Sequence, residues 1–299
     1  MWQDDLRGLN AGELRLDEPL REHTSFRIGG PADALIVPAT LQSLHRVVDF
    51  AAERGLPWFI LGRGTNLLVR DGGWRGLVVK PSACLRRLEV SGTRITAGAG
   101  VSLAELAAAA AAHALAGLAF AAGIPGSLGG GIYMNAGAYG GELAQTLVSV
   151  RAYYPGRGAV TWPAPDLGLG YRTSRFQGET ALIEEAAFAL ARGEEGAIRE
   201  EMASYARRRQ AKQPLSLPSA GSVFKRPAGG YAGPLIEAAG LKGARVGDAQ
   251  VSTLHANFIV NLGQARACDV LALIRLVQER VREHSGILLE PEIRIIGED

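Results

Sequence analysis

Cysteine and histidine are scarce in this sequence. Its two cysteines, Cys84 and Cys268, stand far apart, and no Cys-x-x-Cys pair occurs. The sequence therefore indicates neither a disulfide scaffold nor a dithiol redox centre, and a reducing, cytoplasmic setting fits this composition. The five histidines are dispersed, without His-Glu-x-x-His or a cluster of His and Cys, so we predict no metal site.

Excess charge and long apolar runs are also missing. The 32 basic and 30 acidic residues give a net charge of +2, which is too small to attract nucleic acid or an anionic membrane, so we expect small-molecule partners. The N-terminus lacks the basic and apolar regions of a signal peptide. Residues 106–122 are mostly alanine and too weakly apolar to span a membrane, so we predict that they form a soluble helix, which the capping box Ser102–Glu105 begins.

Two common nucleotide-binding motifs are absent. No Gly-x-x-x-x-Gly-Lys-Ser/Thr sequence occurs, which excludes a P-loop. Gly62-Arg-Gly64 begins like a dinucleotide fingerprint, but it joins two predicted strands, whereas the fingerprint requires a strand that enters a helix. A Rossmann site is therefore disfavoured.

Glycine, by contrast, is abundant. The chain has 39 glycines, and 17 of them lie between Gly62 and Gly141. Ten of these lie in three segments, 62–66, 123–131 and 134–141. Without Cβ atoms, such segments can place backbone N–H groups against an anion such as a pyrophosphate. Tight turns in a layer of small residues are the alternative for any one glycine pair, but three clusters so close together favour an extended, phosphate-bearing cofactor.

The hydrophobic pattern predicts short strands that alternate with helices. In the first region, Thr40 begins a helix and Gly55 ends it, between strands, which indicates a small α/β domain. The second region, from about residue 84 to 210, contains further strands, the alanine-rich helix and a closing helix, 196–210. The strands expected in these two regions are 34–37, 58–61, 67–69, 88–90, 94–97, 147–154 and 181–190.

A proline-rich linker, residues 214–218, introduces a third region. Its longest predicted element is an amphipathic helix, 267–285, which Gly286 stops. The chain then ends in a strand, 292–296, whose alternation places Glu292 and Arg294 on one face.

Ser222 and Lys225 form a Ser-x-x-Lys motif, which is the nucleophile signature of penicillin-binding proteins and β-lactamases. The partner motifs Ser-Asp-Asn and Lys-Thr-Gly are absent. Ser222 also follows Gly221, so a hydroxyl in a turn is the simpler interpretation.

Several segments together resemble one family, that of UDP-N-acetylenolpyruvoylglucosamine reductase. The matching segments, in chain order, are Thr24-Ser-Phe-Arg-Ile-Gly-Gly-Pro31, 61–67, 123–130, Asn135-Ala-Gly-Ala-Tyr-Gly-Gly-Glu142, Tyr171-Arg-Thr-Ser174, 220–224 and 292–296. The resemblance implies an α+β protein with a vanillyl-alcohol-oxidase/PCMH-type FAD-binding fold in two subdomains, plus a smaller α/β substrate-binding domain. The domains expected are 1–82, 83–210 and 211–291, and a return of strand 292–299 to the first is left open.

The resemblance also assigns roles to residues. It implies a non-covalent FAD whose pyrophosphate and ribityl chain are held by Gly62, Arg63, Gly64, Thr65, Asn66, Leu67, Gly123, Ile124, Pro125, Gly126 and Ser127, with Asn135, Ala136, Gly137, Ala138 and Arg209 as further contacts. Arg172, Ser222 and Glu292 match the catalytic positions. Lys212, Lys225, Arg226 and Arg294 are expected near the anionic groups of the substrate.

The chemistry that the resemblance implies fits these residue types. Hydride would pass from NADPH by way of the flavin to the enolpyruvyl ether of a UDP sugar, leaving negative charge at C2. Arg172 and a protonated Glu292 would donate hydrogen bonds to this enolate, and Ser222 would protonate C2. The short stretch from Gly156 to Gly170 indicates a branch of the family without an extra substrate-covering loop.

Two rival functions stay open in the sequence. A flavin oxidase of the same fold would pass electrons to oxygen, and a Ser-x-x-Lys acyl-transfer enzyme would need no flavin. For the reductase we expect a sugar nucleotide as the partner, no nucleic acid or membrane, and a monomer or weak oligomer.

Overall fold

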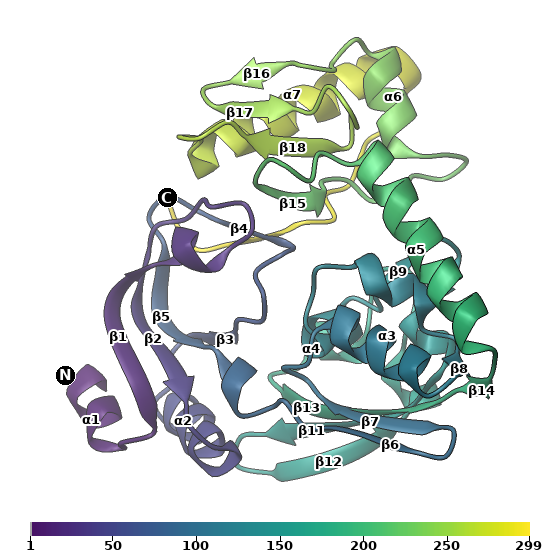
Figure 1. Cartoon of the computed structure of the whole chain (residues 1–299). Helices are drawn as coiled ribbons and strands as arrows, with labels where there is room; N and C mark the ends of the chain where they lie inside the picture. Colours follow the sequence, from purple (N-terminus) through teal and green to yellow (C-terminus); the bar gives the residue numbers. More distant parts are fainter. Residues whose placement is uncertain (1) are drawn as a thin grey trace. The chain divides into compact units, whose positions relative to one another are not determined.

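The protein folds into two compact units, and its elements are drawn in Figure 1. The structure is a computed structural model that describes residues 2–299. Unit 1 comprises the chain up to Arg15, Ala34–Arg63 and Leu77–Arg209, and unit 2 comprises Leu16–Asp33, Gly64–Gly76 and Gln210–Asp299. The division into three domains stays a prediction.

A four-stranded sheet includes the first strands of the chain. Its order is β1 (Gly12–Pro19), β2 (Pro31–Pro38), β5 (Trp74–Val79) and β3 (Trp58–Ile60). Helix α1 (Trp2–Gly8) precedes β1, and α2 (Leu41–Glu53) follows β2. The Thr40 hydroxyl accepts a hydrogen bond from the Ser43 N–H (3.1 Å), and Gly55 adopts a φ of 61° just after the helix, which confirms both predicted ends of α2.

Unit 1 contains a five-stranded antiparallel sheet. Its order is β12 (Gly158–Pro163), β11 (Leu147–Tyr154), β13 (Leu182–Ala189), β7 (Arg94–Gly98) and β6 (Leu88–Ser91). Helices α3 (Leu103–Ala112) and α4 (Leu128–Tyr133) lie over this sheet (Figure 1). Two short pairs complete the unit's strands, namely β10 (Gly141–Glu142) with β9 (Gly137–Ala138) and β14 (Ala191–Arg192) with β8 (Leu115–Ala116).

The alanine-rich helix is shorter than the sequence predicts. The capping box is confirmed, because the Ser102 hydroxyl accepts a hydrogen bond from the Glu105 N–H (3.1 Å) while the Glu105 carboxylate accepts one from the Ser102 N–H (2.9 Å). The prediction that the helix continues through residue 122 is wrong, because α3 ends at Ala112. Ala114 has a φ of 52°, a left-handed conformation that no α-helix can contain. The chain then forms β8 and a 3₁₀ turn, Ala119–Gly123.

Helix α5 (Glu195–Lys212) includes the predicted closing helix, and most of its residues are exposed. Ile198 is its buried residue, and the ring of Tyr205 stacks on that of Tyr139, with centroids 4.6 Å apart. The linker 214–218 lies outside helices and strands, as its prolines predict.

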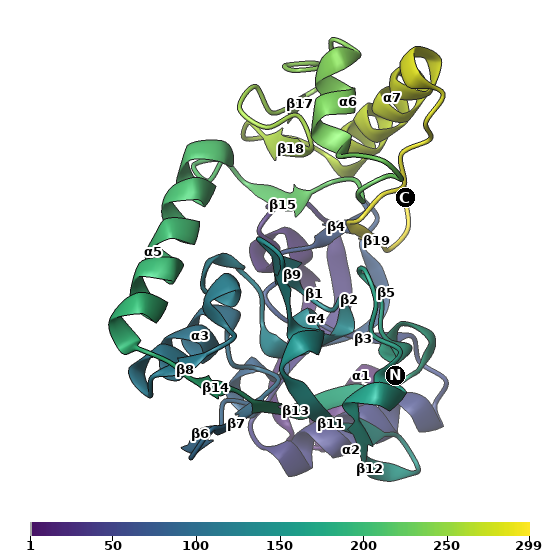
Figure 2. The same ribbon diagram turned by 90° about the vertical axis from the view of Figure 1, so that its right-hand side faces the viewer.

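Unit 2 contains a second α/β arrangement. Its sheet has the order β15 (Ser219–Ser222), β18 (Phe258–Asn261), β17 (Ala249–Val251) and β16 (Arg245–Val246). Helix α7 (Ala267–Ser285) packs against β16 and β17, and α6 (Ala232–Ala238) lies beside α7 (Figure 2). A parallel pair, β19 (Arg294–Ile296) and β4 (Leu67–Val69), brings the end of the chain to an early strand. The core includes Phe26, Ile28 and Leu68 together with the buried face of α7.

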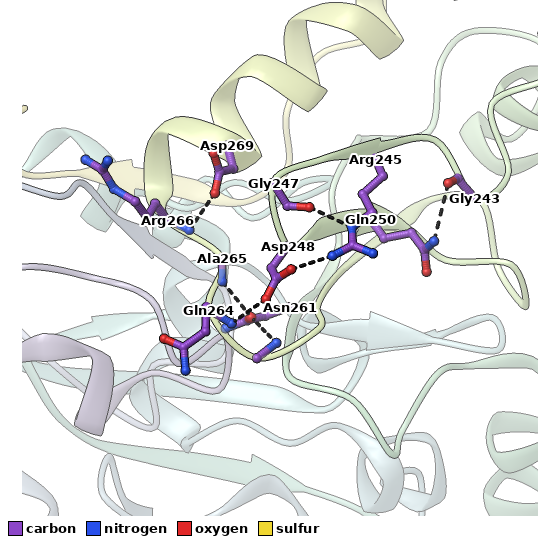
Figure 3. Close-up of polar contacts among 11 residues, drawn as sticks. Gly243, Arg245, Gly247, Asp248, Gln250, Asn261, Gln264, Ala265, Arg266 and Asp269 are labelled. Atoms are coloured by element: carbon purple, nitrogen blue, oxygen red, sulfur yellow. Dashed lines mark hydrogen bonds and ion pairs between the residues drawn. The ribbon is translucent and has the colours of Figure 1, made fainter.

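Polar contacts hold the start of α7 and the loop that precedes it. Asp71 accepts hydrogen bonds from the N–H groups of Ala267 (2.9 Å) and Cys268 (3.0 Å). Figure 3 shows the neighbouring loop, where the Asn261 amide oxygen accepts bonds from Gly263 and Ala265 N–H groups, and Asp269 accepts one from the Arg266 N–H. The contacts of Asp71 and Asp269 satisfy backbone donors that every helix start leaves without partners inside the helix.

No helix within residues 2–299 is long and apolar enough to cross a membrane. In the same part of the chain, no group of three or more His, Cys, Asp or Glu side chains is arranged to hold a metal ion.

Candidate active site

Two of the glycine-rich segments meet within unit 1. A Cβ added to Gly62 would lie 2.4 Å from the Ser127 hydroxyl oxygen, so a side chain at residue 62 would collide with the second segment. Ser127 is fixed in turn, because its hydroxyl caps α4 by accepting the Gly130 N–H (3.4 Å) and the neighbouring Leu128 N–H binds the Val101 carbonyl (2.8 Å). The two segments therefore form one continuous backbone surface with few side chains.

Arg209 from α5 lies against the same surface. Its Cδ is 3.4 Å from where a Cβ of Gly123 would be. Burial lowers the pKa of this guanidinium, with a small opposing effect of Tyr139. Within residues 2–299, Arg209 has no carboxylate or other hydrogen-bond partner. A half-buried cation next to a glycine turn lacks the anion that such a charge requires, and a pyrophosphate would supply it. The residues present therefore fit a phosphate-bearing cofactor such as FAD.

Other glycines of these segments have a packing role, as the alternative interpretation proposed. A Cβ on Gly131 would meet the side chains of Leu143 and Leu103 at 3.1–3.2 Å, and one on Gly141 would lie 2.5 Å from the Phe120 ring. The glycine-rich stretch thus serves two purposes, close packing and a backbone surface.

Asn135 joins two of the predicted site segments. It is buried, with a φ of 42°. Its amide oxygen accepts the Ala144 N–H (3.1 Å), and its amide nitrogen donates to the Gly170 carbonyl (3.1 Å). Its side chain therefore connects two loops. Of the residues that follow, Ala136 donates its N–H to the Gly131 carbonyl (2.7 Å), and Gly137 and Ala138 form β9.

Arg172 occupies an unusual backbone position. It lies in a tight turn that Gly170 and Thr173 close with two reciprocal backbone hydrogen bonds of 3.2 Å each. Its φ is 57°, which an L residue rarely adopts. One guanidinium nitrogen donates to the Gly137 carbonyl (3.4 Å), and the guanidinium carbon lies 5.1 Å from the Tyr171 ring centre. No sequence pattern indicated this conformation.

Ser222 and Glu292 lie together within unit 2. The Glu292 N–H donates to the carbonyl of Val223, the residue after Ser222, at 2.7 Å. Gly221 has a φ of 80°, and the pairing of β15 with β18 is irregular between Ser219 and Ser222, so the strand bends where Ser222 is presented. Among residues 2–299, the Ser222 hydroxyl has no hydrogen-bond partner.

The loop before β4 completes this group. The Asn66 amide donates to the Glu292 carbonyl (3.3 Å), and the Arg294 N–H donates to the Asn66 carbonyl (2.9 Å). Leu67 pairs with Arg294 in the β4–β19 ladder. Gly64 is held in a left-handed turn with a φ of 61°, where a Cβ would lie 2.3 Å from the His23 carbonyl oxygen. Thr65, which lies between Gly64 and Asn66 in the chain, is half-buried. Arg63, which belongs to unit 1, is partly exposed.

The predicted substrate cations have different surroundings. Lys225 forms an ion pair with Glu290, so the ammonium that the Ser-x-x-Lys hypothesis requires as a base is bound to a carboxylate. Arg226 lies over the Tyr231 ring, with its guanidinium carbon 4.3 Å from the ring centre. Lys212 is exposed, and its charge adds to burial and to Lys242 in lowering the pKa of His255.

Comparisons with known proteins agree with this architecture. A family model described as an FAD binding domain matches residues 32–162, and one described as the UDP-N-acetylenolpyruvoylglucosamine reductase C-terminal domain matches residues 213–296. The UDP-N-acetylenolpyruvoylglucosamine reductase of Syntrophomonas wolfei is 46% identical over 299 residues, covering 100% of both chains. The UDP-N-acetylenolpyruvoylglucosamine reductase 2 of Symbiobacterium thermophilum is 48% identical, covering 96% of this chain and 94% of its own.

A solved structure has the same fold. The crystal structure of the reductase from Thermus caldophilus superposes with a TM-score of 0.81 at 38% identity, covering 95% of this chain and 98% of its own. The fold and the glycine-lined surface thus define an α+β protein with the PCMH-type FAD-binding architecture. Within that class, the chain belongs to the UDP-N-acetylenolpyruvoylglucosamine reductase family.

Proposed function

We propose that this protein reduces UDP-N-acetylglucosamine enolpyruvate to UDP-N-acetylmuramate, with FAD as cofactor and NADPH as hydride donor, in the synthesis of peptidoglycan precursors. Membership of the reductase family supports this activity over the oxidase and acyl-transfer alternatives. The structural observation that supports the proposal is the backbone hydrogen bond from the Glu292 N–H to the carbonyl of Val223, the residue after Ser222, whose hydroxyl has no hydrogen-bond partner among residues 2–299.

FAD supplies the hydride-transfer chemistry when it is bound. We propose that the residues 62–67 and 123–127 hold its phosphates through their backbone, with Arg209 as the counter-charge. The contact of Gly62 with Ser127 and the half-buried, unpartnered guanidinium of Arg209 support this assignment. Asn135 to Ala138 would lie next to this surface, since the Ala136 N–H donates to the carbonyl of Gly131 in the same glycine-rich stretch (2.7 Å).

The catalytic roles follow from the chemistry of the side chains. Adding hydride at C3 of an enolpyruvyl ether leaves negative charge at C2, conjugated to the carboxylate. Arg172 always carries its proton and can donate two hydrogen bonds to one carboxylate or enolate. The Ser222 hydroxyl, free of other partners within the described chain, can give its proton to C2. Positive charge from Lys212, Arg226 and Arg294 would bind the anionic substrate and stabilise the resulting alkoxide.

The test combines spectroscopy with Ser222→Ala. The wild-type protein should be yellow, lose colour with NADPH in the absence of air, and regain it with the sugar nucleotide. Ser222→Ala should still bleach, while turnover falls by about 10²- to 10⁴-fold, the usual contribution of a general acid. Ser219→Ala, on the same strand, serves as the control and should keep wild-type turnover.

Three outcomes would contradict the proposal. A colourless protein would refute the flavin, and an unchanged turnover of Ser222→Ala would remove Ser222 from the mechanism. Return of colour in air alone, at a rate similar to that with the sugar nucleotide, would favour the oxidase.

We further propose that the protein works in the cytoplasm as a monomer or weak oligomer and binds no nucleic acid. The supply of NADPH and UDP sugars inside cells supports the location. Light scattering after gel filtration at micromolar concentration should give a mass near the 31.5 kDa of one chain, and a stable larger species would contradict the oligomeric state.

A further inference from the structure

The side chain of Gln177 contacts the backbone of the turn that carries Arg172. Gln177 lies in the 3₁₀ turn Arg175–Gly178, directly after the Tyr-Arg-Thr-Ser segment. Its amide nitrogen donates to the Arg172 carbonyl (2.9 Å) and to the Tyr133 carbonyl (2.9 Å). A primary amide has two N–H donors, and the two carbonyls are its nearest acceptors, with the Met134 sulfur further away at 3.6 Å.

The second carbonyl belongs to the helix that starts at the cofactor segment. Tyr133 is the last residue of α4, whose first turn Ser127 caps. Its carbonyl oxygen also accepts the Ser174 hydroxyl at 2.8 Å, which fills both lone pairs. Gln177 thus ties the Arg172 peptide to the C-terminal end of a helix that begins beside Gly62.

Arg172 requires such a constraint. An L residue at a φ of 57° is strained relative to the ordinary helical or extended conformations, and it persists only where neighbouring groups hold it. Asn135 fixes the turn from the Gly170 carbonyl, and Gln177 fixes it from the Arg172 carbonyl. Relaxation of residue 172 to a negative φ would rotate this carbonyl away from Gln177 and redirect the guanidinium.

We propose that Gln177 is a positioning residue for Arg172: its amide holds the carbonyl of Arg172 and thereby keeps the guanidinium in the orientation that stabilises the enolate. This proposal rests on the proposed function, since it presumes that Arg172 acts on the substrate. Gln177 has no contact with the substrate in this role and acts only through the turn.

Gln177→Glu tests the proposal because it keeps the shape of the side chain and replaces the donors by a carboxylate that the two carbonyl oxygens repel. Bleaching by NADPH should keep its wild-type rate, while the return of colour with the sugar nucleotide should slow by about 10- to 100-fold, as expected when a catalytic group is misplaced by about an ångström. Gln177→Lys supplies new N–H donors and should restore at least half of the wild-type rate.

The matched control is Gln145→Glu. Gln145 also donates from its amide to a backbone carbonyl, that of Gly140 (3.1 Å), but it is exposed and has no contact with the Arg172 turn. Its substitution should leave both rates within twofold of wild type.

A second measurement does not depend on activity. Amide hydrogen exchange of the peptide 170–177, followed by mass spectrometry on protein without added substrate, should be at least fivefold faster in Gln177→Glu than in the wild type and Gln145→Glu. FAD affinity, measured by titration of the apoprotein, should stay within threefold of wild type.

Unchanged return of colour in Gln177→Glu would overturn the proposal. So would an equal loss of both rates or of FAD affinity, because that pattern indicates a general structural role. Failure of the proposed function can be distinguished from failure of this proposal. If the proposed function is wrong, the wild type will not regain colour with the sugar nucleotide, but the exchange measurement still tests the contact of Gln177 with the Arg172 carbonyl.

Discussion

The guanidinium of Arg209 is partly buried, and no carboxylate within residues 2–299 pairs with it. In the protein without cofactor, this cation loses hydration and gains no ion pair, so it costs folding free energy. Binding of a pyrophosphate would reverse the sign of this contribution, because hydrogen bonds to charged groups stabilise by about 1.5–3 kcal/mol. The same side chain is thus unfavourable in one state and favourable in the other.

Arg209→Met should therefore separate cofactor affinity from stability. FAD affinity should fall by about 10- to 100-fold, the equivalent of about 1.5–3 kcal/mol, whereas the melting temperature of the apoprotein should stay constant or rise. Arg208→Met is the control, because Arg208 is exposed and lies over the Tyr139 ring. FAD titration and thermal unfolding check both values. An apoprotein of Arg209→Met that is clearly less stable, with unchanged FAD affinity, would show that the guanidinium has only a structural role.

Backbone conformations at single residues could not be predicted from the sequence. Arg172, Asn135 and Ala114 all have positive φ values, although none is glycine. The conformational preferences of these residue types do not predict such values, because contacts with the surrounding structure impose them. The kind of ligand could be predicted from the sequence, because clustered glycines allow backbone N–H groups to approach an anion closely. The proximity of Ser222 and Glu292 required the structure, since it depends on a hydrogen bond between segments far apart in the chain.

At the scale of elements, α7 depends on a carboxylate that lies far from it in sequence. Asp71 accepts two N–H groups of its first turn. Burial raises the pKa of Asp71, but the hydrogen bonds from Cys268 and Ala267 and the charge of Arg266 outweigh this effect, so the pKa is lowered. The folded state therefore favours the ionised form.

Asp71→Ala should destabilise the protein by about 1–2 kcal/mol at pH 7, the usual effect of losing a helix cap. Because the pKa of Asp71 is lowered on folding, its contribution is present above the ordinary Asp value of about 3.9 and is lost as pH falls through the lower, folded value. Urea unfolding at pH 7 and at decreasing pH should show a difference from wild type that shrinks below about pH 4.

Asp33→Ala is the matched control for this experiment. The side chains of Asp33 and Asp71 are both 25% exposed, and Asp33 makes an ion pair with Arg75. A partly exposed ion pair of this kind near the surface contributes about 1 kcal/mol or less. A loss for Asp71→Ala no larger than for Asp33→Ala, or one independent of pH, would contradict the capping role.

Elements with local signals were predicted well. The helix α7 has the predicted bounds, because an apolar stripe repeats over its length and Gly286 ends it with a φ of 74°. The start of α3 followed from its capping box, but its end did not, because Ala114 carries no stop signal. The short strands β16 to β18 were missed, since two to four residues are too few for a pattern to emerge.

At the scale of the whole molecule, unit 2 is assembled from three separate stretches of chain. The stretch from residue 210 onward contains the region that the C-terminal family model matches. However, the core of the unit also includes Phe26, Ile28 and Leu68, which are at most 2% exposed, and β19 pairs with β4. The unit is therefore larger than its C-terminal stretch.

A fragment of residues 210–299 should consequently fail to fold alone. It loses three buried apolar side chains worth about 5–9 kcal/mol together, which is comparable to the whole stability of a typical domain. Circular dichroism during heating should show no cooperative transition, whereas the full chain should show one. A dispersed amide spectrum and a sharp transition for the fragment would contradict this prediction.

The pairing of β4 with β19 can form only late in the synthesis of the chain. A ribosome finishes β4 at Val69 and reaches Arg294 only more than 200 residues later, an interval of about 10–45 s at 5–20 residues per second. Throughout that time β4 lacks its partner strand, and such unpaired edges invite association with other chains. Glu292 emerges in the same last seconds, so a chain still attached to the ribosome cannot contain a finished site, however early its glycine-rich segments fold.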